Sequence, residues 1–171
     1  MLAVGALTTC TSLAPPHAED AQVLSGRLSI HVESDPVRAL SGAFELSGNA
    51  RAGALVLTSP LGSTLAQARW SPGEAVLQTP GASARYSDLE TLAEQTLGER
   101  VPLAALFDWL RGRPWSGATS EALPDGEPGF SQIGWRVDLA RYAEGWVDAR
   151  RDTPPVVTMR ARLDGSGTAA P

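Results

Sequence analysis

The sequence predicts a single α+β domain that consists mainly of antiparallel strands. Three observations support this class. Short stretches with period-2 alternation recur about every ten residues between 23 and 86, and Gly or Pro stands at the turn after each one. The apolar period then changes to that of helices between 87 and 112, and strand-like stretches return from 130. With 171 residues, of which 43% are hydrophobic, the chain is long enough for one domain with a core and too short for two.

The first ten residues are typical of the end of a bacterial lipoprotein signal. An apolar stretch becomes small and polar immediately before Cys10, which is the single cysteine of the chain and therefore excludes an intrachain disulfide. Thr9 stands where this signal prefers Gly, Ala or Ser, and no positive charge precedes the apolar stretch, which is what a start placed too far downstream would produce. The alternative is an N-terminus with an incidental cysteine. Residues 11–22 are polar and contain Pro15-Pro16, so we expect a tether before a domain at 23–163.

The first two strands are expected at 23–33 and 40–47, where apolar and polar residues alternate. His31 falls on the polar face of the first strand, and no nucleophile motif accompanies it, so we interpret it as a surface histidine. Two further strands are joined by Ser59-Pro60-Leu61-Gly62-Ser63, where Pro and Gly favour a type II turn with Leu61 at its tip. A Leu at a tip either folds back onto the sheet or points into the surroundings. Two more short strands follow at 75–78 and 82–86.

Two amphipathic helices are expected next. Ser87 offers an N-cap with Glu90 three residues later, as in a capping box, and Gly98 ends the helix. A second helix begins at Pro102 and ends at Gly112. The apolar stripes must lie on the apolar face of the sheet; their members are Leu89, Leu92, Ala93, Thr96 and Leu97, then Leu103, Leu106, Phe107, Trp109 and Leu110.

Residues 113–129 are expected to be a long irregular connection, whose scattered acidic residues do not have the spacing of a metal site. Strands return at 130–139, where Ile133, Trp135 and Val137 are expected to share one side, and again at 146–147 and 156–159. A flexible tail is expected over 164–171.

Charge and motifs exclude several function classes. The net charge of −5, with all basic residues being Arg and none clustered, argues against binding to nucleic acid. The sequence has no nucleotide-binding Gly-rich loop, no Gly-x-Ser-x-Gly, no His-Glu-x-x-His and no Cys-His cluster. We therefore expect neither an enzyme nor a cofactor, and no metal site. No segment has the length of a transmembrane helix.

Five stretches in one order resemble the family of the outer-membrane lipoprotein receptor LolB. They are Gly26-Arg27-Leu28-Ser29-Ile30, Gly42-Ala43-Phe44-Glu45-Leu46, the Leu57–Leu65 block, Val101-Pro102-Leu103 through Trp109-Leu110-Arg111-Gly112, and Gln132-Ile133-Gly134-Trp135. The resemblance implies an incomplete, open β-barrel that encloses an apolar cavity covered by a helical lid. It implies lipidation of Cys10 and a protruding loop, here Pro60, Leu61 and Gly62, that helps to release cargo into the membrane.

The resemblance also implies a function and partners. The protein would be anchored by lipid in the outer membrane, facing the periplasm, would accept acylated lipoproteins from a periplasmic carrier of the LolA type, and would insert them into the membrane, acting as a monomer. The expected cavity residues are Leu28, Ile30, Phe44, Leu46, Leu55, Leu57, Leu103, Leu106, Phe107 and Leu110. The family's closing strand is not apparent, so either the barrel is one strand short or the C-terminus has diverged, and closure of the cavity is expected to be incomplete at one edge. The alternatives are a lipid-anchored envelope protein that binds a free lipid or a protein partner without transfer, and a hydrolase.

Overall fold

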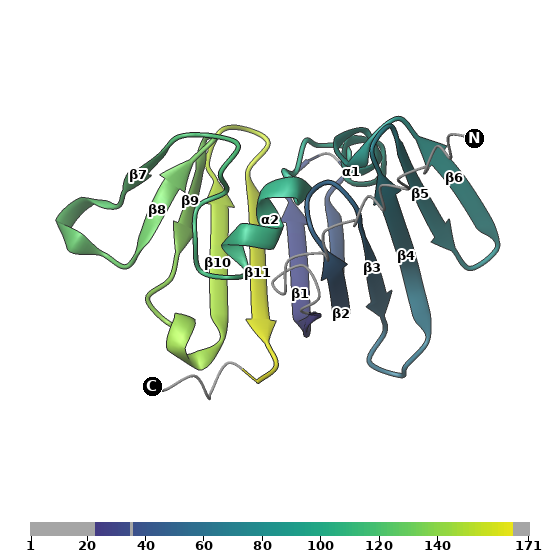
Figure 1. Ribbon diagram of the computed structural model, residues 1–171, viewed down its shortest axis with the longest axis horizontal. Coiled ribbons are helices and arrows are strands. Elements are labelled where there is room, and N and C mark those ends of the chain that lie inside the picture. The colour runs from purple at the N-terminus through teal and green to yellow at the C-terminus, as the bar shows by residue number, and fades with distance from the viewer. Residues whose placement is uncertain (1–22, 35, 166–171) are drawn as a thin grey trace, which may run out of the picture.

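The computed structural model describes residues 23–34 and 36–165. The predicted lipidation site, the tether and most of the predicted tail lie outside these residues. The described part forms an antiparallel sheet of 11 strands with the order β6-β5-β4-β3-β2-β1-β11-β10-β9-β8-β7, and two α-helices lie against it (Figure 1). Among the described residues β6 and β7 end the order and do not pair with each other, so the sheet is open, and the predicted fold class is confirmed.

The strands in the first half of the chain are successive hairpins. Their bounds are β1 Leu24–Val32, β2 Arg38–Gly48, β3 Gly53–Thr58, β4 Thr64–Ser71, β5 Glu74–Thr79 and β6 Ala82–Tyr86. In β1 every second residue from Gly26 to Val32 is buried, and the polar residues between them, including His31, are exposed. The alternation read from the sequence therefore fixes which face of the sheet carries the core.

The helices are α1 Leu89–Leu97 and α2 Leu103–Trp109. Asp88, not Ser87, is the N-cap of α1, and its carboxylate accepts a hydrogen bond of 2.7 Å from the backbone N–H of Thr91. The prediction of Ser87 was wrong by one residue because both side chains are good caps and the Ser87 hydroxyl donates to the Asp88 carboxylate instead. Gly98 ends α1 in the left-handed conformation, as predicted. Four of the five stripe residues of α1 are buried, but Thr96 is exposed.

The second half of the sheet contains β7 Ser120–Ala122, β8 Gly129–Gln132, β9 Trp135–Asp138, β10 Trp146–Arg151 and β11 Val157–Leu163, with short 3₁₀ turns at Pro124–Gly126 and Tyr142–Glu144. The prediction that 113–129 is entirely irregular was wrong, since β7 pairs with β8. The prediction that Ile133 shares a side with Trp135 was also wrong. Ile133 and Gly134 both have positive φ and form the two-residue turn between β8 and β9, which leaves Ile133 exposed.

The last strand lies in the middle of the sheet. β11 pairs with β10 on one side and with β1 on the other, from Gly26 opposite Leu163 to Val32 opposite Val157. The expectation that a missing C-terminal strand leaves one edge incomplete is therefore corrected, because the two edges are formed by β6 and β7, far from the C-terminus.

The sheet curves around α2. Phe107 of α2 meets the ring of Trp70 in β4 edge to face, with centroids 5.4 Å apart, and Trp109 of α2 lies 5.8 Å from Trp135 in β9. Five strands lie between β4 and β9 in the sheet order, which corresponds to about 29 Å across a flat sheet at about 4.8 Å per strand. Because a helix is only about 10 Å wide, both contacts require the sheet to bend around α2 as an incomplete barrel.

Candidate functional site: a protruding hairpin and a helix-covered core

The β3–β4 hairpin is closed by backbone hydrogen bonds at its base. The Ser59 N–H donates to the Ser63 carbonyl at 2.8 Å, and the Gly62 N–H donates to the Ser59 carbonyl at 2.9 Å. Gly62 has a φ of 82°, whereas Leu61 has no positive φ. The turn is therefore not type II, which needs positive φ at the position of Leu61, a conformation that a Leu side chain resists. Gly62, one residue later, adopts the left-handed conformation, which costs glycine nothing.

Leu61 stands at the tip of this hairpin with 94% of its surface exposed, and Pro60 and Gly62 beside it are also exposed. Of the two conformations that the sequence left open, the structure has the one in which the side chain points into the surroundings. Leaving a Leu in water instead of an apolar medium costs about 1.5–3 kcal/mol. The geometry therefore places an apolar group where it can enter another apolar phase.

The residues predicted to line the cavity come together on the concave face of the sheet. Eight of them are buried in one hydrophobic cluster, namely Leu28, Ile30, Phe44, Leu46, Leu57, Leu106, Phe107 and Leu110. Leu55 and Leu103 are half-buried and pack against that cluster. The sequence thus identified the apolar face of β1, β2, β3 and α2.

The same cluster extends into the second half of the sheet, which the predicted cavity set omitted. Its large buried side chains there are Phe130, Trp135, Val137 and Met159, and the predicted set also lacked Trp70 of β4 and Trp109 of α2. The signal for β9 and β11 was present in the sequence as alternation, most clearly at Val157, Met159, Ala161 and Leu163. The predicted cavity set did not include the residues of β9 and β11, because it was taken only from β1 to β3 and from the α2 region.

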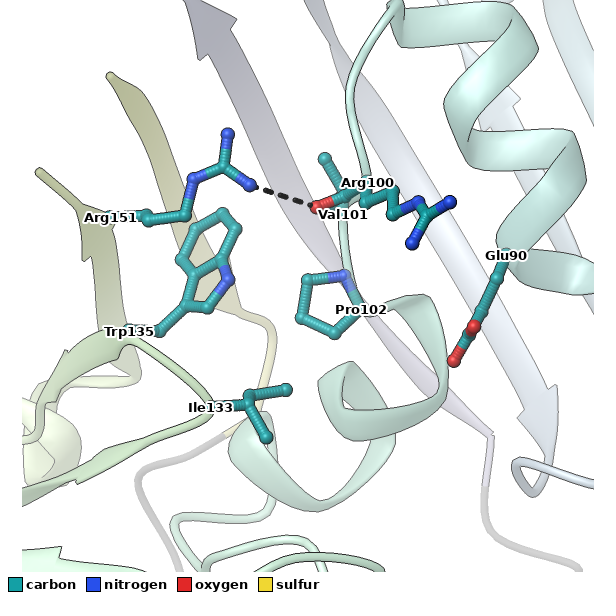
Figure 2. Close-up of a pocket in the computed structure, with 7 residues that line it drawn as sticks. All are labelled: Glu90, Arg100, Val101, Pro102, Ile133, Trp135 and Arg151. Carbon is teal, nitrogen blue, oxygen red and sulfur yellow. Dashed lines mark hydrogen bonds between the residues drawn. The ribbon is translucent and has the colours of Figure 1, made fainter. Parts of the chain in front are cut away.

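A pocket of about 210 Å³ opens where the helical cover meets the second half of the sheet (Figure 2). It is lined by Glu90, Arg100, Val101, Pro102, Ile133, Trp135 and Arg151. Val101 and Trp135 are each only 2% exposed, so the pocket leads from the surface to the edge of the buried cluster. A pocket in this place can admit a small apolar group at the boundary between α2 and the sheet.

Arg151 ties the α1–α2 connection to the sheet beside this pocket. Its guanidinium donates to the carboxylate of Glu99 at 2.8 Å, and, as Figure 2 shows, it also reaches the backbone carbonyl of Arg100, at 3.4 Å. It lies over the ring of Trp135, 5.8 Å from the centroid. The connection between the two helices is therefore held at the end of β10 by one side chain.

The side chain of Gln132 in β8 forms hydrogen bonds with the end of α2 and with the segment that follows it. This side chain is 2% exposed; its carbonyl accepts hydrogen bonds from the Trp109 indole and the Trp115 backbone N–H, both at 2.9 Å, and its amide donates to the carbonyls of Trp115 and Ala118. A buried amide with all its hydrogen bonds made fixes the position of the groups around it. Gln132 thereby fixes the end of α2 and the following segment against β8.

Groups for catalysis or metal binding do not gather at this site. Among residues 23–34 and 36–165, no three His, Cys, Asp or Glu side chains are close enough together to hold a metal ion. Of the side chains that line the pocket, Glu90, Arg100 and Arg151 carry charge, and the rest are apolar. No helix in this part of the chain is long and apolar enough to cross a membrane. The arrangement is suited to holding and releasing apolar groups.

Comparison with known proteins agrees with this geometry. The family described as "Outer membrane lipoprotein LolB" matches residues 20–164. The chain is 39% identical over 151 residues to the outer-membrane lipoprotein LolB of Bordetella pertussis, covering 82% of this chain and 76% of the relative. It is 33% identical over 169 residues to that of Cupriavidus metallidurans, covering 92% and 81%, and 34% identical over 172 residues to that of Cupriavidus necator, covering 94% and 84%.

The family match covers both parts of the site, the β3–β4 hairpin with Leu61 at its tip and the two helices over the buried cluster. The three relatives match most of the chain at 33–39% identity. On this evidence the chain belongs to the LolB family of outer-membrane lipoproteins.

Proposed function

We propose that this protein is the outer-membrane receptor that accepts acylated lipoproteins and inserts them into the membrane in which it is anchored. The observation that carries the proposal is the pairing of an exposed Leu61 on a projecting hairpin with a helix-covered apolar cluster inside one curved sheet. The first feature suits contact with a bilayer, and the second suits acyl chains. The membership of the family supports the same function and the outer membrane as its place.

The route of transfer follows from the energetics of acyl chains. Each methylene kept out of water contributes about 0.8 kcal/mol, so a path that exposed a whole chain would be very slow. A transfer from one apolar cavity to another, and from there to the bilayer, replaces one buried environment with the next. It therefore needs no energy cofactor and no catalytic group.

The finer features of the proposal are the donor, the anchor and the loop. The donor is a periplasmic carrier of the LolA type, and Cys10 carries the lipid that anchors the chain. Acyl chains enter between the concave face of the sheet and α2, among the ten predicted residues from Leu28 to Leu110, which pack against one another in the structure. Leu61 enters the bilayer and gives the chains a continuous apolar exit.

The test is transfer of a labelled acylated lipoprotein from the loaded carrier to this protein, followed by addition of liposomes. The wild-type chain is expected to take up the label and then to lose it to the liposomes. Leu61→Glu is expected to accept cargo normally and to retain it. Ala52→Glu is the matched control, because Ala52 is also exposed, in the β2–β3 turn at the other end of the sheet.

The outcomes separate the proposed receptor from its alternative. Failure of the wild-type chain to take cargo from the carrier would favour an envelope protein that binds a free lipid or a protein partner without transfer. Normal release by Leu61→Glu would remove the role of the hairpin while leaving acceptance intact.

A further inference from the structure

Four large apolar side chains are strongly exposed among the described residues. They are Val23, Val37, Leu61 and Ile133, with exposed fractions of 57%, 60%, 94% and 44%. Val23 precedes β1, whereas the other three lie in turns or connections: Val37 between β1 and β2, Leu61 between β3 and β4, and Ile133 between β8 and β9. Scattered exposed apolar residues are common, so the question is whether these three share a place.

The strand registers put the three turns at one end of the sheet. Val32 pairs with Arg38 at the β1–β2 connection, and Thr58 pairs with Thr64 at the β3–β4 hairpin. Connections at the same end of an antiparallel sheet occur at every second hairpin, so these two lie at the same end.

The remaining registers show which turn of the other half of the sheet lies at this same end. Val32 also faces Val157 of β11, and Val157 faces Arg151 of β10. Arg150, the neighbour of Arg151, faces Arg136 of β9, next to the turn that contains Ile133. The end that carries Val37 and Leu61 is therefore the end that carries Ile133.

The connection between α1 and α2 also contacts the sheet at this end. The pocket contains Ile133 itself, together with Val101 and Pro102 before α2. Gly98, at the end of α1, lies so close to Arg38 that a Cβ there would approach the guanidinium to 2.6 Å. The α1–α2 connection and the three exposed apolar side chains thus form one rim, which we call the hydrophobic rim and define by Val37, Leu61 and Ile133.

We propose that the hydrophobic rim is the membrane-facing end of the protein, so that Val37 and Ile133 enter the lipid surface together with Leu61. This deepens the proposed function and rests on it in one respect, the entry of Leu61 into the bilayer. The rim sets the orientation of the whole sheet to the membrane and directs the pocket beside α2 toward the lipid.

Two features favour a bilayer over a protein as the occupant. The three side chains project singly from separate turns and do not form a continuous apolar patch, which a fluid apolar medium accommodates better than a rigid protein surface. The exposed guanidinium of Arg38 lies next to Val37, and that of Arg100 lies beside the pocket, where phospholipid phosphates would meet them.

The test uses the full-length chain with Cys10→Ser, which removes the predicted anchor and leaves no other cysteine. Val37→Cys, Leu61→Cys and Ile133→Cys are each labelled with an environment-sensitive fluorophore and mixed with liposomes of phosphatidylethanolamine and phosphatidylglycerol. Ala52→Cys, at the opposite end, is the control. All three rim positions are expected to show a blue shift and quenching by nitroxide lipids, and position 52 neither.

Charge substitutions supply the second measurement. Val37→Asp and Ile133→Asp are each expected to weaken liposome binding about tenfold, which corresponds to withdrawing one apolar side chain from the lipid. Both positions are exposed, so folding is expected to be unchanged. Uptake of cargo from the carrier is expected to remain normal in Val37→Asp, because Val37 does not line the pocket beside α2.

Any other result contradicts the proposal that the three residues of the hydrophobic rim enter the lipid together. A response at position 61 alone would mean that the hairpin enters lipid without the other turns, and the proposed function would stand. A response at none of the three would remove the entry of Leu61 as well, while uptake from the carrier would still test acceptance. Equal responses at 52 would indicate unspecific adsorption, and responses to the carrier without liposomes would make the rim a protein contact.

Discussion

Arg151 donates a hydrogen bond of 2.8 Å to Glu99, and this contact joins the last residue of β10 to the connection between the two helices. The two side chains are only 16% and 24% exposed, so the ion pair is better shielded from water than the others at the surface. The connection between the helices is therefore joined to the sheet by two residues that are 52 positions apart in the sequence.

Arg151→Met should loosen this connection. We expect the free energy of unfolding to fall by about 1–2 kcal/mol, because Glu99 and two backbone carbonyls lose a charged donor. Hydrogen exchange of the amides of residues 98–101 and of Leu103 should speed up more than exchange in β1. Arg150→Ala is the control, since its pair with Asp152 is exposed and should contribute less than about 0.5 kcal/mol. Equal exchange in both variants would contradict this role of Arg151.

Gln132 should be among the least tolerant positions of the chain. Gln132→Leu leaves the Trp109 indole and three backbone groups around it without their partner, and we expect a loss of about 3 kcal/mol in urea unfolding. Gln78→Leu, on an exposed site of β5, should change stability by less than about 0.5 kcal/mol. A small effect of Gln132→Leu would mean that water replaces these hydrogen bonds.

The N-cap of α1 should make part of the stability depend on acid pH. Hydrogen bonds from the Thr91 backbone and side chain, and then from Ser87, hold the pKa of the Asp88 carboxyl below its ordinary value of 3.8. A carboxyl with a lowered pKa contributes stability that is complete above the ordinary value and is lost as the pH falls below it. The free energy of unfolding of the wild-type chain minus that of Asp88→Asn should therefore be constant at neutral pH. It should decrease as the pH falls below 3.8. Urea unfolding of both proteins at several pH values measures it; parallel curves down to acid pH would contradict the prediction.

The distance between the start of β1 and the hydrophobic rim sets a minimum length for the tether, because the proposed anchor and the rim meet the same membrane. Val23 lies at the start of β1, and the rim lies at the other end of this nine-residue strand, about 30 Å away. Residues 11–22 reach at most about 43 Å when extended at about 3.6 Å per residue. Deleting residues 14–20 reduces this reach to about 18 Å.

In the lipidated protein this deletion should leave uptake of cargo intact and slow its insertion into the protein's own membrane. Replacing residues 14–20 with seven Gly and Ser residues should restore insertion, because only the length matters. If the deletion has no effect, the rim does not face the membrane that holds the anchor. The labelled lipoprotein of the transfer experiment reports both steps.

Most of the strands and both helices could be predicted, because period-2 and helical alternation reflect which face is buried. The errors occurred where local signals were ambiguous. Ile133 interrupts an apolar alternation that reads as continuous, and only the neighbouring Gly134 indicates the turn. β7 has three residues, all exposed, and leaves no apolar pattern to detect. The role of Gln132 and the contact between Arg151 and Glu99 depend on segments far apart in the chain, which no local pattern reports.

The hairpin residues that the sequence singled out lie as predicted at a tip, but the turn type was wrong. Pro60 and Gly62 suggested a type II turn without regard to the backbone preference of Leu61 between them. The face of the core was found for the same reason as the strands. How the concave face is filled could not be found in this way, because it depends on how Trp70 and Trp135 pack against α2, which carries Trp109.

The two free edges of the sheet bear on self-association. An open sheet presents unpaired backbone groups to which a strand of a second molecule can add, and this is a common route to aggregation. Here the edges are the five-residue β6 and the three-residue β7, and each carries an exposed charge, Arg85 on one and Glu121 on the other. Such short, charged edges give a neighbouring chain little to pair with. The open sheet can thus remain a single molecule in solution, and light scattering of the Cys10→Ser chain should find a monomer.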